Sequence, residues 1–285
     1  MSVGTASPAH PAVALRHRLS VELLSPTQVI HLRQALAASQ AIADDRGYEH
    51  WAGIHGLPLP MYCTHGSPLF LPWHRAYLYS FELSLRDASP GLSGFALPWW
   101  DWTSRASHAH GIPAAYAAAT EMGGGANPLH SAAVNPIAIK QDLAEGEQIG
   151  ATTVRQPDAP GHLPTLADVN KALALSDFLD FSGQVENIHN NVHVWVGGHM
   201  GEIPVAAYDP LFWAHHCMID RLWRIWQLRH PGSAVPASLL GEALAPFSMT
   251  VSQTIDATSL GYDYAATTSA AVPAAPPTPA TGGGS

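Results

Sequence analysis

Residues 209–230, DPLFWAHHCMIDRLWRIWQLRH, carry a helical signal along their whole length. An aspartate followed by a proline is a common way for a helix to begin. Apolar residues recur at helical spacing in two stripes, of which one contains His216 and the other His215. The segment therefore predicts a helix with packed surroundings on both stripes, and periodicity alone does not separate the roles of the two histidines.

Four further helices are expected, over residues 26–45, 70–86, 165–179 and 184–194. The first begins with Ser25 as N-cap and a proline in its first turn, and the third begins with a capping box at Thr165. Residues 104–164 are rich in Gly, Ala, Pro and Ser, which favours long loops with short helical pieces. The predicted fold class is mainly α, an antiparallel helix bundle core with large loops and little β structure.

The composition excludes several classes of partner. The net charge of −9 disfavours nucleic acid and anionic membranes, since both require clustered Lys and Arg. No apolar run approaches the ~18 residues of a membrane-spanning helix. No secretion signal is visible, so a cytoplasmic location is expected, with export beside a partner protein as the alternative. We expect one domain over residues 1–264 and a disordered Ala/Pro/Gly-rich tail over residues 265–285.

The chain contains 17 histidines and only two cysteines, Cys63 and Cys217. In HNNVH, His189 and His193 are four residues apart and therefore lie on one helix face, where they could bind a metal ion. That motif is weak by itself, because two solvated or backbone-bonded histidines would look the same. The segment YCTHGSPLFLPWHR (62–75) adds two more histidines within an apolar run, and an unpaired buried imidazole is costly.

Several imidazoles without a carboxylate-rich motif favour copper, zinc or nickel over magnesium or calcium. A catalytic zinc would use three histidines and leave the others idle. A di-iron site would need two Glu-x-x-His motifs, and the chain offers one, which ends at His189. A pair of metal ions with three histidines each accounts for the inventory best.

Six segments in order, GIHG, YCTHG, FLPWHR, LPWWDW, ENIHNNVHVWVGG and DPLFWAHHCMIDRLW, resemble the type-3 copper proteins. This family comprises tyrosinases, catechol oxidases and mollusc haemocyanins, and the resemblance extends over roughly residues 15–264. It implies a binuclear site of two copper ions, bound by His55, His65 and His74 on one side and by His189, His193 and His216 on the other. His215 is then expected to be a satisfied core residue.

The resemblance also implies chemistry for individual residues. Cys63 in YCTHG resembles the fungal and molluscan cysteine that is joined to the histidine two residues later, here His65, by a thioether bond. Glu186 and Asn190 stand where tyrosinases hold the water that deprotonates a phenol. The implied activity is that of a polyphenol oxidase and monooxygenase, which hydroxylates phenols and oxidises o-diphenols to o-quinones with dioxygen as co-substrate. An o-aminophenol or catechol oxidase without monophenol activity, and an oxygen carrier of the haemocyanin type, are the alternatives.

Other expected roles are structural or lie at the substrate entrance. Asp101 and Asp220 are expected to fix ring and backbone geometry, and Tyr262 and Tyr264 resemble a tyrosine motif that packs near an N-terminal arginine such as Arg18. The predicted substrate rim consists of Val194, His199, Met200, Ala206 and Ala207. The expected substrate is a small phenol. The chain length and loops suit a bacterial stand-alone enzyme, for which a copper-delivery chaperone is a possible partner.

Overall fold

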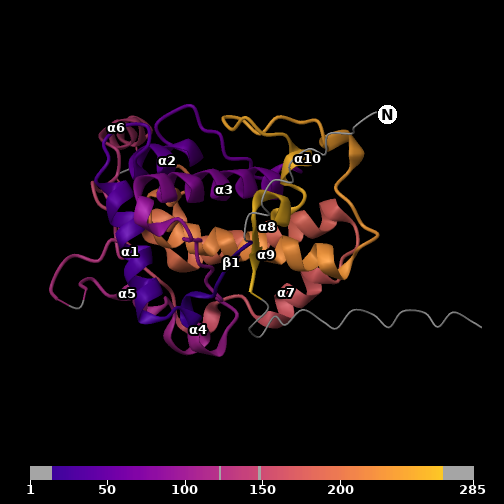
Figure 1. Ribbon diagram of the computed structural model, residues 1–285, viewed down its shortest axis with the longest axis horizontal. Coiled ribbons are helices and arrows are strands. Elements are labelled where there is room, and N and C mark those ends of the chain that lie inside the picture. Colours follow the sequence, from indigo (N-terminus) through magenta and orange to yellow (C-terminus); the bar gives the residue numbers. More distant parts are fainter. Residues whose placement is uncertain (1–14, 122, 147–148, 266–285) are drawn as a thin grey trace, which may run out of the picture.

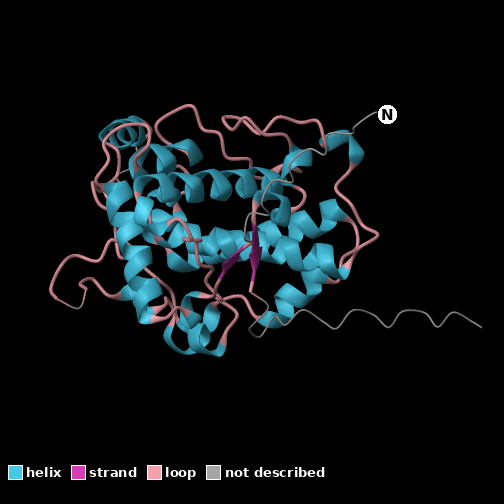
Figure 2. Cartoon of the chain, in the orientation of Figure 1, coloured by secondary structure: helices cyan, strands magenta, loops and turns pink. Residues whose placement is uncertain are grey.

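The computed structural model describes residues 15–121, 123–146 and 149–265, and within them the chain is mainly helical (Figures 1 and 2). The α-helices of these residues are α1 (Pro26–Gln40), α2 (Tyr48–His55), α3 (Phe70–Ala88), α4 (Arg105–His110), α5 (Ala114–Ala117), α6 (Pro136–Ala144), α7 (Leu166–Leu173), α8 (Phe178–Val196), α9 (Leu211–Arg229) and α10 (Val251–Thr254). Two three-residue strands, β1 (Arg16–Arg18) and β2 (Tyr262–Tyr264), complete them. The predicted fold class is confirmed. The predicted tail from residue 266 onward lies outside the described residues.

Helices α3, α8 and α9 form the centre of the molecule, and α3 is drawn above α8 and α9 in Figure 1. The predicted burial of the 209–230 segment is confirmed, because nearly every side chain of α9 up to Trp226 is excluded from solvent. Helix α8 buries one face and exposes the other, whereas α3 is buried on all sides over residues 70–78 and reaches solvent near its C-terminal end, at Leu83 and Asp87. Among the described helices, none is long and apolar enough to cross a membrane.

The boundary between the third and fourth predicted helices differs from the prediction. The third helix was expected to continue to about residue 179, but α7 stops at Leu173. The Asp177 carboxylate accepts hydrogen bonds from the N–H groups of Leu179 and Asp180 and so starts α8 six residues earlier than expected. Helix α2 was also missed, and His55, expected in a loop, is its last residue.

Strands β1 and β2 pair and so bring the two ends of the described chain together. They pair in parallel, with Arg18 opposite Tyr264, and so bring the N-terminal arginine to the C-terminal tyrosines. The Arg18 guanidinium lies 3.8 Å from the ring centroid of Tyr262 and donates a hydrogen bond to the Tyr264 hydroxyl at 3.0 Å. The predicted proximity of Arg18 to this tyrosine motif is confirmed.

Asp220 is the centre of a buried ionic network rather than a partner of a histidine ring. Its carboxylate accepts hydrogen bonds from Arg75 at 2.5 Å, from Tyr262 at 2.7 Å and from Tyr264 at 2.5 Å. Asp220, expected to fix ring and backbone geometry, thus holds two tyrosine rings and an arginine, and none of its hydrogen bonds among the described residues goes to an imidazole. Asp101 does fix backbone geometry, since it accepts a hydrogen bond from the N–H of Thr103.

Candidate metal centre

The six histidines of the sequence prediction converge from four helices and one loop. His55 ends α2, His65 lies in the loop before α3, and His74 lies on α3. The ring centroids of these three are 5.4 to 5.8 Å apart, so they form a nearly equilateral triangle. We call this set the first triad.

The second triad consists of His189 and His193 on α8 and His216 on α9, with ring centroids 4.4 to 5.4 Å apart. The two triads face each other. The rings of His74 and His216 stack with centroids 4.5 Å apart, and those of His65 and His189 with centroids 5.6 Å apart. The structure therefore brings together residues that lie up to 161 positions apart in the printed sequence, at one point between α3, α8 and α9.

In His55 and His74, a hydrogen bond at Nδ1 determines whether Nε2 carries a proton or a free lone pair. Nδ1 of His55 lies 3.1 Å from the carbonyl oxygen of Ile203, and Nδ1 of His74 lies 2.8 Å from that of Phe70. Because a carbonyl oxygen only accepts, each Nδ1 carries the proton and each Nε2 presents a lone pair. Both Nε2 atoms are buried without a hydrogen-bond partner among the described residues. Buried lone pairs of this kind fit a metal ion.

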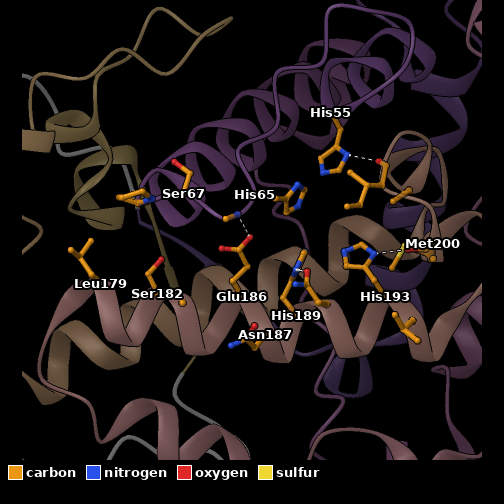
Figure 3. A pocket seen from close by; sticks show the side chains of 18 residues that line it. His55, His65, Ser67, Leu179, Ser182, Glu186, Asn187, His189, His193 and Met200 are labelled. Carbon is orange, nitrogen blue, oxygen red and sulfur yellow. Dashed lines mark hydrogen bonds between the residues drawn. The ribbon is translucent and has the colours of Figure 1, made fainter.

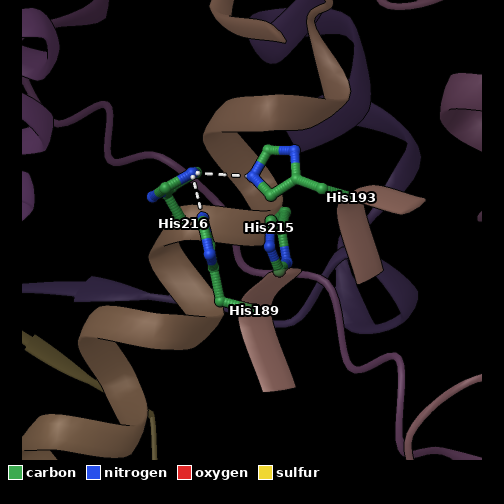
Figure 4. Close-up of side chains that lie close together, drawn as sticks. All are labelled: His189, His193, His215 and His216. Carbon is green, nitrogen blue, oxygen red and sulfur yellow. Dashed lines mark hydrogen bonds between the residues drawn. The ribbon is translucent and has the colours of Figure 1, made fainter. Parts of the chain in front are cut away.

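The second triad fits a metal ion for the same reason (Figure 4). Nδ1 of His193 is held by the carbonyl oxygen of Met200 at 2.7 Å, and Nδ1 of His189 by the side-chain oxygen of Asn190 at 2.9 Å. Nε2 of His216 lies 3.2 Å from Nε2 of each of these two rings. A single proton can serve only one of these pairs, whereas one cation would satisfy all three nitrogens.

His215 lies beside the second triad, and one of its ring nitrogens lies within 4.8 Å of ring nitrogens of His189, His193 and His216. Its ring is parallel to that of His189, with centroids 5.2 Å apart, and it takes no part in the contacts between the other three nitrogens (Figure 4). It is fully buried, as expected. The backbone of His189 is the polar group that interacts with its ring, and the geometry of this contact is weak.

Burial keeps the triads neutral. Desolvation, reinforced by the neighbouring histidines, holds the pKa of His55, His74, His189 and His216 well below the ordinary value of 6.5. Burial also lowers the pKa of His193 to about 4. These imidazoles are therefore unprotonated at neutral pH, which is the state that binds metal ions.

An open cavity of about 640 Å³ leads to the two triads (Figure 3). Its walls come from the loop after His65, from one face of α8 and from the segment around residues 200–206. Glu186 and Asn190 both line it. Gly66, in the left-handed region with φ +61°, donates its N–H to Oε1 of Glu186 at 2.5 Å. Burial raises the pKa of Glu186, and the hydrogen bond from Gly66 offsets part of that increase.

The predicted rim is only partly the observed one. Val194, Met200 and Ala206 line the cavity, whereas His199 and Ala207 do not. The His199 ring is buried and holds the backbone of the preceding loop instead, since its Nδ1 accepts from the N–H of Val154 at 3.1 Å. The sequence does not show in which direction these two side chains point, and the structure buries both of them away from the cavity.

Several lining residues were not predicted from the sequence. They are Gly66, Ser67, Pro68, Leu179, Ser182, Gly183, Asn187, Gly201 and Ile203. The spacing of Leu179, Ser182, Glu186, His189 and His193, three or four residues apart, is the signal that would have found those on α8. A start of this helix at residue 178 was needed to extend the stripe that far.

Cys63 lies next to the first triad. Its Sγ and the ring nitrogens of His55 and His65 are all within 4.8 Å of one another. Both cysteines of the chain are free thiols, and burial raises the pKa of Cys63 to about 12. The sulfur is therefore close to the imidazoles but is not a thiolate at neutral pH.

Comparison with known proteins agrees with this geometry. A family model described as the common central domain of tyrosinase matches residues 45–229. The chain is 36% identical over 196 residues to a tyrosinase of Streptomyces antibioticus, an alignment that covers 59% of this chain and 66% of that protein. It is 32% identical over 223 residues to hemocyanin units G and H of Sepia officinalis, covering 74% of this chain and 37% of that protein.

Among solved structures, a functional unit of Octopus hemocyanin superposes with a TM-score of 0.73 at 30% identity. That alignment covers 87% of this chain and 68% of the other. The chain spans less than two thirds of the length of the Streptomyces tyrosinase and of the Sepia hemocyanin. Tyrosinases and hemocyanins both occur among its relatives.

Proposed function

Because the chain belongs to the tyrosinase family of type-3 copper proteins, we propose that it is a dicopper oxidase that converts phenols and o-diphenols to o-quinones with dioxygen. The observation that carries this proposal is the arrangement of the two triads at the end of an open cavity. Four of the six rings, those of His55, His74, His189 and His193, are fixed by a hydrogen bond at Nδ1, which leaves the lone pair of Nε2 for a metal ion. The six histidines would hold two copper ions, which supply the capacity to bind and reduce dioxygen.

The protein itself would contribute rigidity, access and proton transfer. The hydrogen bonds to Nδ1 of four triad rings fix their orientation before any ligand arrives. The cavity is large enough to admit a small phenol with its hydroxyl toward the triads. Oxidation of a phenol requires removal of its proton, and Glu186 is the carboxylate that lines this cavity.

Glu186 and Asn190 are assigned different parts of this task. Glu186 makes a single hydrogen bond among the described residues, to Gly66, so its second oxygen remains available to a water or a phenol. Asn190 uses its side-chain oxygen to hold Nδ1 of His189, which leaves its NH₂ group to donate to the same water. Glu186 is therefore proposed as the proton acceptor, and Asn190 as a positioning residue with a second role in water binding.

The proposal is tested by loading the full chain with copper and measuring dioxygen uptake on matched monophenol and o-diphenol substrates, beside a metal analysis. We expect about two copper ions per chain and turnover of both substrates. Turnover of the diphenol alone would support the catechol or o-aminophenol oxidase. Reversible dioxygen binding without turnover would support a carrier, which the Sepia and Octopus relatives make the principal alternative. Absence of copper binding would overturn all three.

Replacing Glu186 by Gln is expected to lower monophenol turnover by about 10²- to 10⁴-fold, the usual contribution of a general base. Diphenol turnover should change less than tenfold, because a catechol loses its protons more readily. Replacing Asn190 by Ala should lower both activities, since it also releases the His189 ring. Asn191→Ala, an exposed change on the same helix outside the cavity, is the control. Equal losses on both substrates in Glu186→Gln would remove Glu186 from the proton-transfer role.

We further propose that Cys63 and His65 become joined by a thioether bond when the copper-loaded protein turns over. The bond forms between Sγ and a ring carbon, and two hydrogens are lost with their two electrons to dioxygen. Unfolded, copper-matured protein should then titrate as one thiol, that of Cys217, and its mass should be lower by two hydrogens. Protein prepared without copper should titrate as two thiols. Two thiols in both preparations would exclude the bond.

A further inference from the structure

The cavity continues past the triads along α8, away from His193 (Figure 3). We call this part the outer lobe and define it by Ser67, Pro68, Leu179, Ser182 and Gly183, all of which line the cavity. Ser182 is seven residues before His189, which is about 10 Å along a helix axis. That span suits a phenol whose hydroxyl is at the triads and whose para substituent extends into the lobe.

One polar group of the outer lobe has no partner. The Ser182 side chain is 3% exposed, and its Oγ makes no hydrogen bond among the described residues. The hydroxyl of Ser67, by contrast, accepts a hydrogen bond from the N–H of Leu69 at 3.2 Å. A buried hydroxyl without a hydrogen-bond partner is unfavourable. A hydrogen bond from a ligand or a water to the Ser182 hydroxyl would therefore be stabilising. The close-up shows this side chain on the cavity side of α8 (Figure 3).

The cavity wall has an acidic side chain and no basic one among the described residues. Among residues 15–121, 123–146 and 149–265, no lysine or arginine lines it, and Glu186 is the only carboxylate that does. Arg18 and Arg75 are buried in the Asp220 network, and Arg155 is paired with Asp209 at 2.6 Å. An anionic group in the outer lobe would therefore lose hydration without gaining a cationic partner, at a net chain charge of −9.

We propose that the outer lobe binds the para substituent of the phenol and selects neutral or cationic hydrogen-bonding groups over carboxylates, with the Ser182 hydroxyl as the contact. This inference rests on the proposed oxidase function and adds a substrate class to it. The preferred substrates are phenols that carry an amine or an alcohol on a short para chain. Phenolic acids of the same length are poor substrates.

Four para-substituted phenols test the lobe, namely tyramine, 4-(2-hydroxyethyl)phenol, 4-ethylphenol and 4-hydroxyphenylacetate. In the copper-loaded protein, kcat/KM for the carboxylate should be at least about tenfold below that for the alcohol. Ser182→Ala should raise KM about three- to tenfold for the amine and the alcohol and leave 4-ethylphenol unchanged. Ser39→Ala is the matched control, because the Ser39 hydroxyl is also buried without a partner but lies on α1, outside the cavity.

A charge introduced at the lobe tests the electrostatic part separately. Leu179 lines the cavity and is 45% exposed, so Leu179→Lys places a cation at the entrance without burying it. It should raise kcat/KM for 4-hydroxyphenylacetate about threefold or more and lower that for tyramine. Leu228→Lys, at 46% exposure on α9 and outside the cavity, should change neither.

The outcomes separate failure of the lobe from failure of the function. Equal kcat/KM for the acid and the alcohol, or an identical response of 4-ethylphenol and the alcohol to Ser182→Ala, would overturn the lobe while leaving the oxidase intact. If no phenol or catechol is oxidised, the function fails. The same four compounds are then ranked by calorimetric binding to the copper-loaded chain, where the same order supports the lobe and tighter binding of the acid overturns it.

Discussion

Replacing His216 by glutamine is expected to remove about one of two copper ions and to abolish phenol and catechol oxidation. His216 has its Nε2 3.2 Å from the Nε2 atoms of both His189 and His193, so its loss opens one side of the second triad. Loss of an outer-shell partner of a metal ligand already costs 10- to 100-fold in affinity or activity, and loss of the ligand itself should cost more. Copper content by elemental analysis and dioxygen uptake are the measurements.

His230, the residue that follows the last residue of α9, provides a control for general damage. Nε2 of His230 donates a hydrogen bond to the carbonyl oxygen of Leu173, 2.9 Å away, and the ring lies outside the cavity. His230→Gln should retain full copper and full activity. If His216→Gln kept two copper ions and normal turnover, the assignment of His216 as a ligand would be wrong.

Replacing Asp220 by asparagine is expected to destabilise the fold by about 3–5 kcal/mol, the usual cost of removing one partner from a buried ion pair. The buried Arg75 guanidinium, 2.5 Å from the Asp220 carboxylate, would lose its counter-charge. Arg18 would lose a partner at 3.3 Å but keep its ion pair with Glu82 at 2.9 Å. For a domain of this size such a change lowers Tm by roughly 6–20 °C. Thermal unfolding followed by circular dichroism measures the difference.

Asp263→Asn is the matched control, because the Asp263 and Arg224 side chains, 2.9 Å apart, are each about one-fifth exposed. Such partly exposed pairs contribute about 0–1 kcal/mol. An equal effect of both substitutions would mean that the Asp220 network adds no more than a surface pair.

The stabilisation by Asp220 should also depend on pH. Burial opposes ionisation of its carboxyl, but Arg75 and Arg18 outweigh burial and lower its pKa below the ordinary 3.8. The contribution is therefore complete above pH 3.8 and decreases as the pH falls through the lower value of the folded state. The difference in unfolding free energy between the natural chain and Asp220→Asn should shrink in that acid range. A difference that stayed constant down to the acid limit of folding would contradict this account.

The sequence by itself determined the helical class, the buried character of α9 and, through the order of its motifs, the family and the six triad histidines. These features depend on the identity of residues that are close in the sequence. A capping serine, a helical period and a short motif are each recognised from such neighbours. The same locality explains the errors. The sequence signals of the N-cap at Asp177 and of the short helix α2 are weaker than the helical periodicity of the neighbouring segments, so the prediction started α8 too late and missed α2.

Only the tertiary structure decided which atoms meet. Neighbouring helix residues point about 100° apart, so the packing of α9 against α8 brings Nε2 of His216 to 3.2 Å from the Nε2 atoms of His189 and His193 and stacks the His215 ring beside that of His189. The same packing turns His199 inward, commits Asp220 to the arginines and leaves the Ser182 hydroxyl facing the cavity without a partner. Periodicity gives the face of one helix, whereas a site is the meeting of faces from several elements, and their relative placement is fixed by packing across the whole chain.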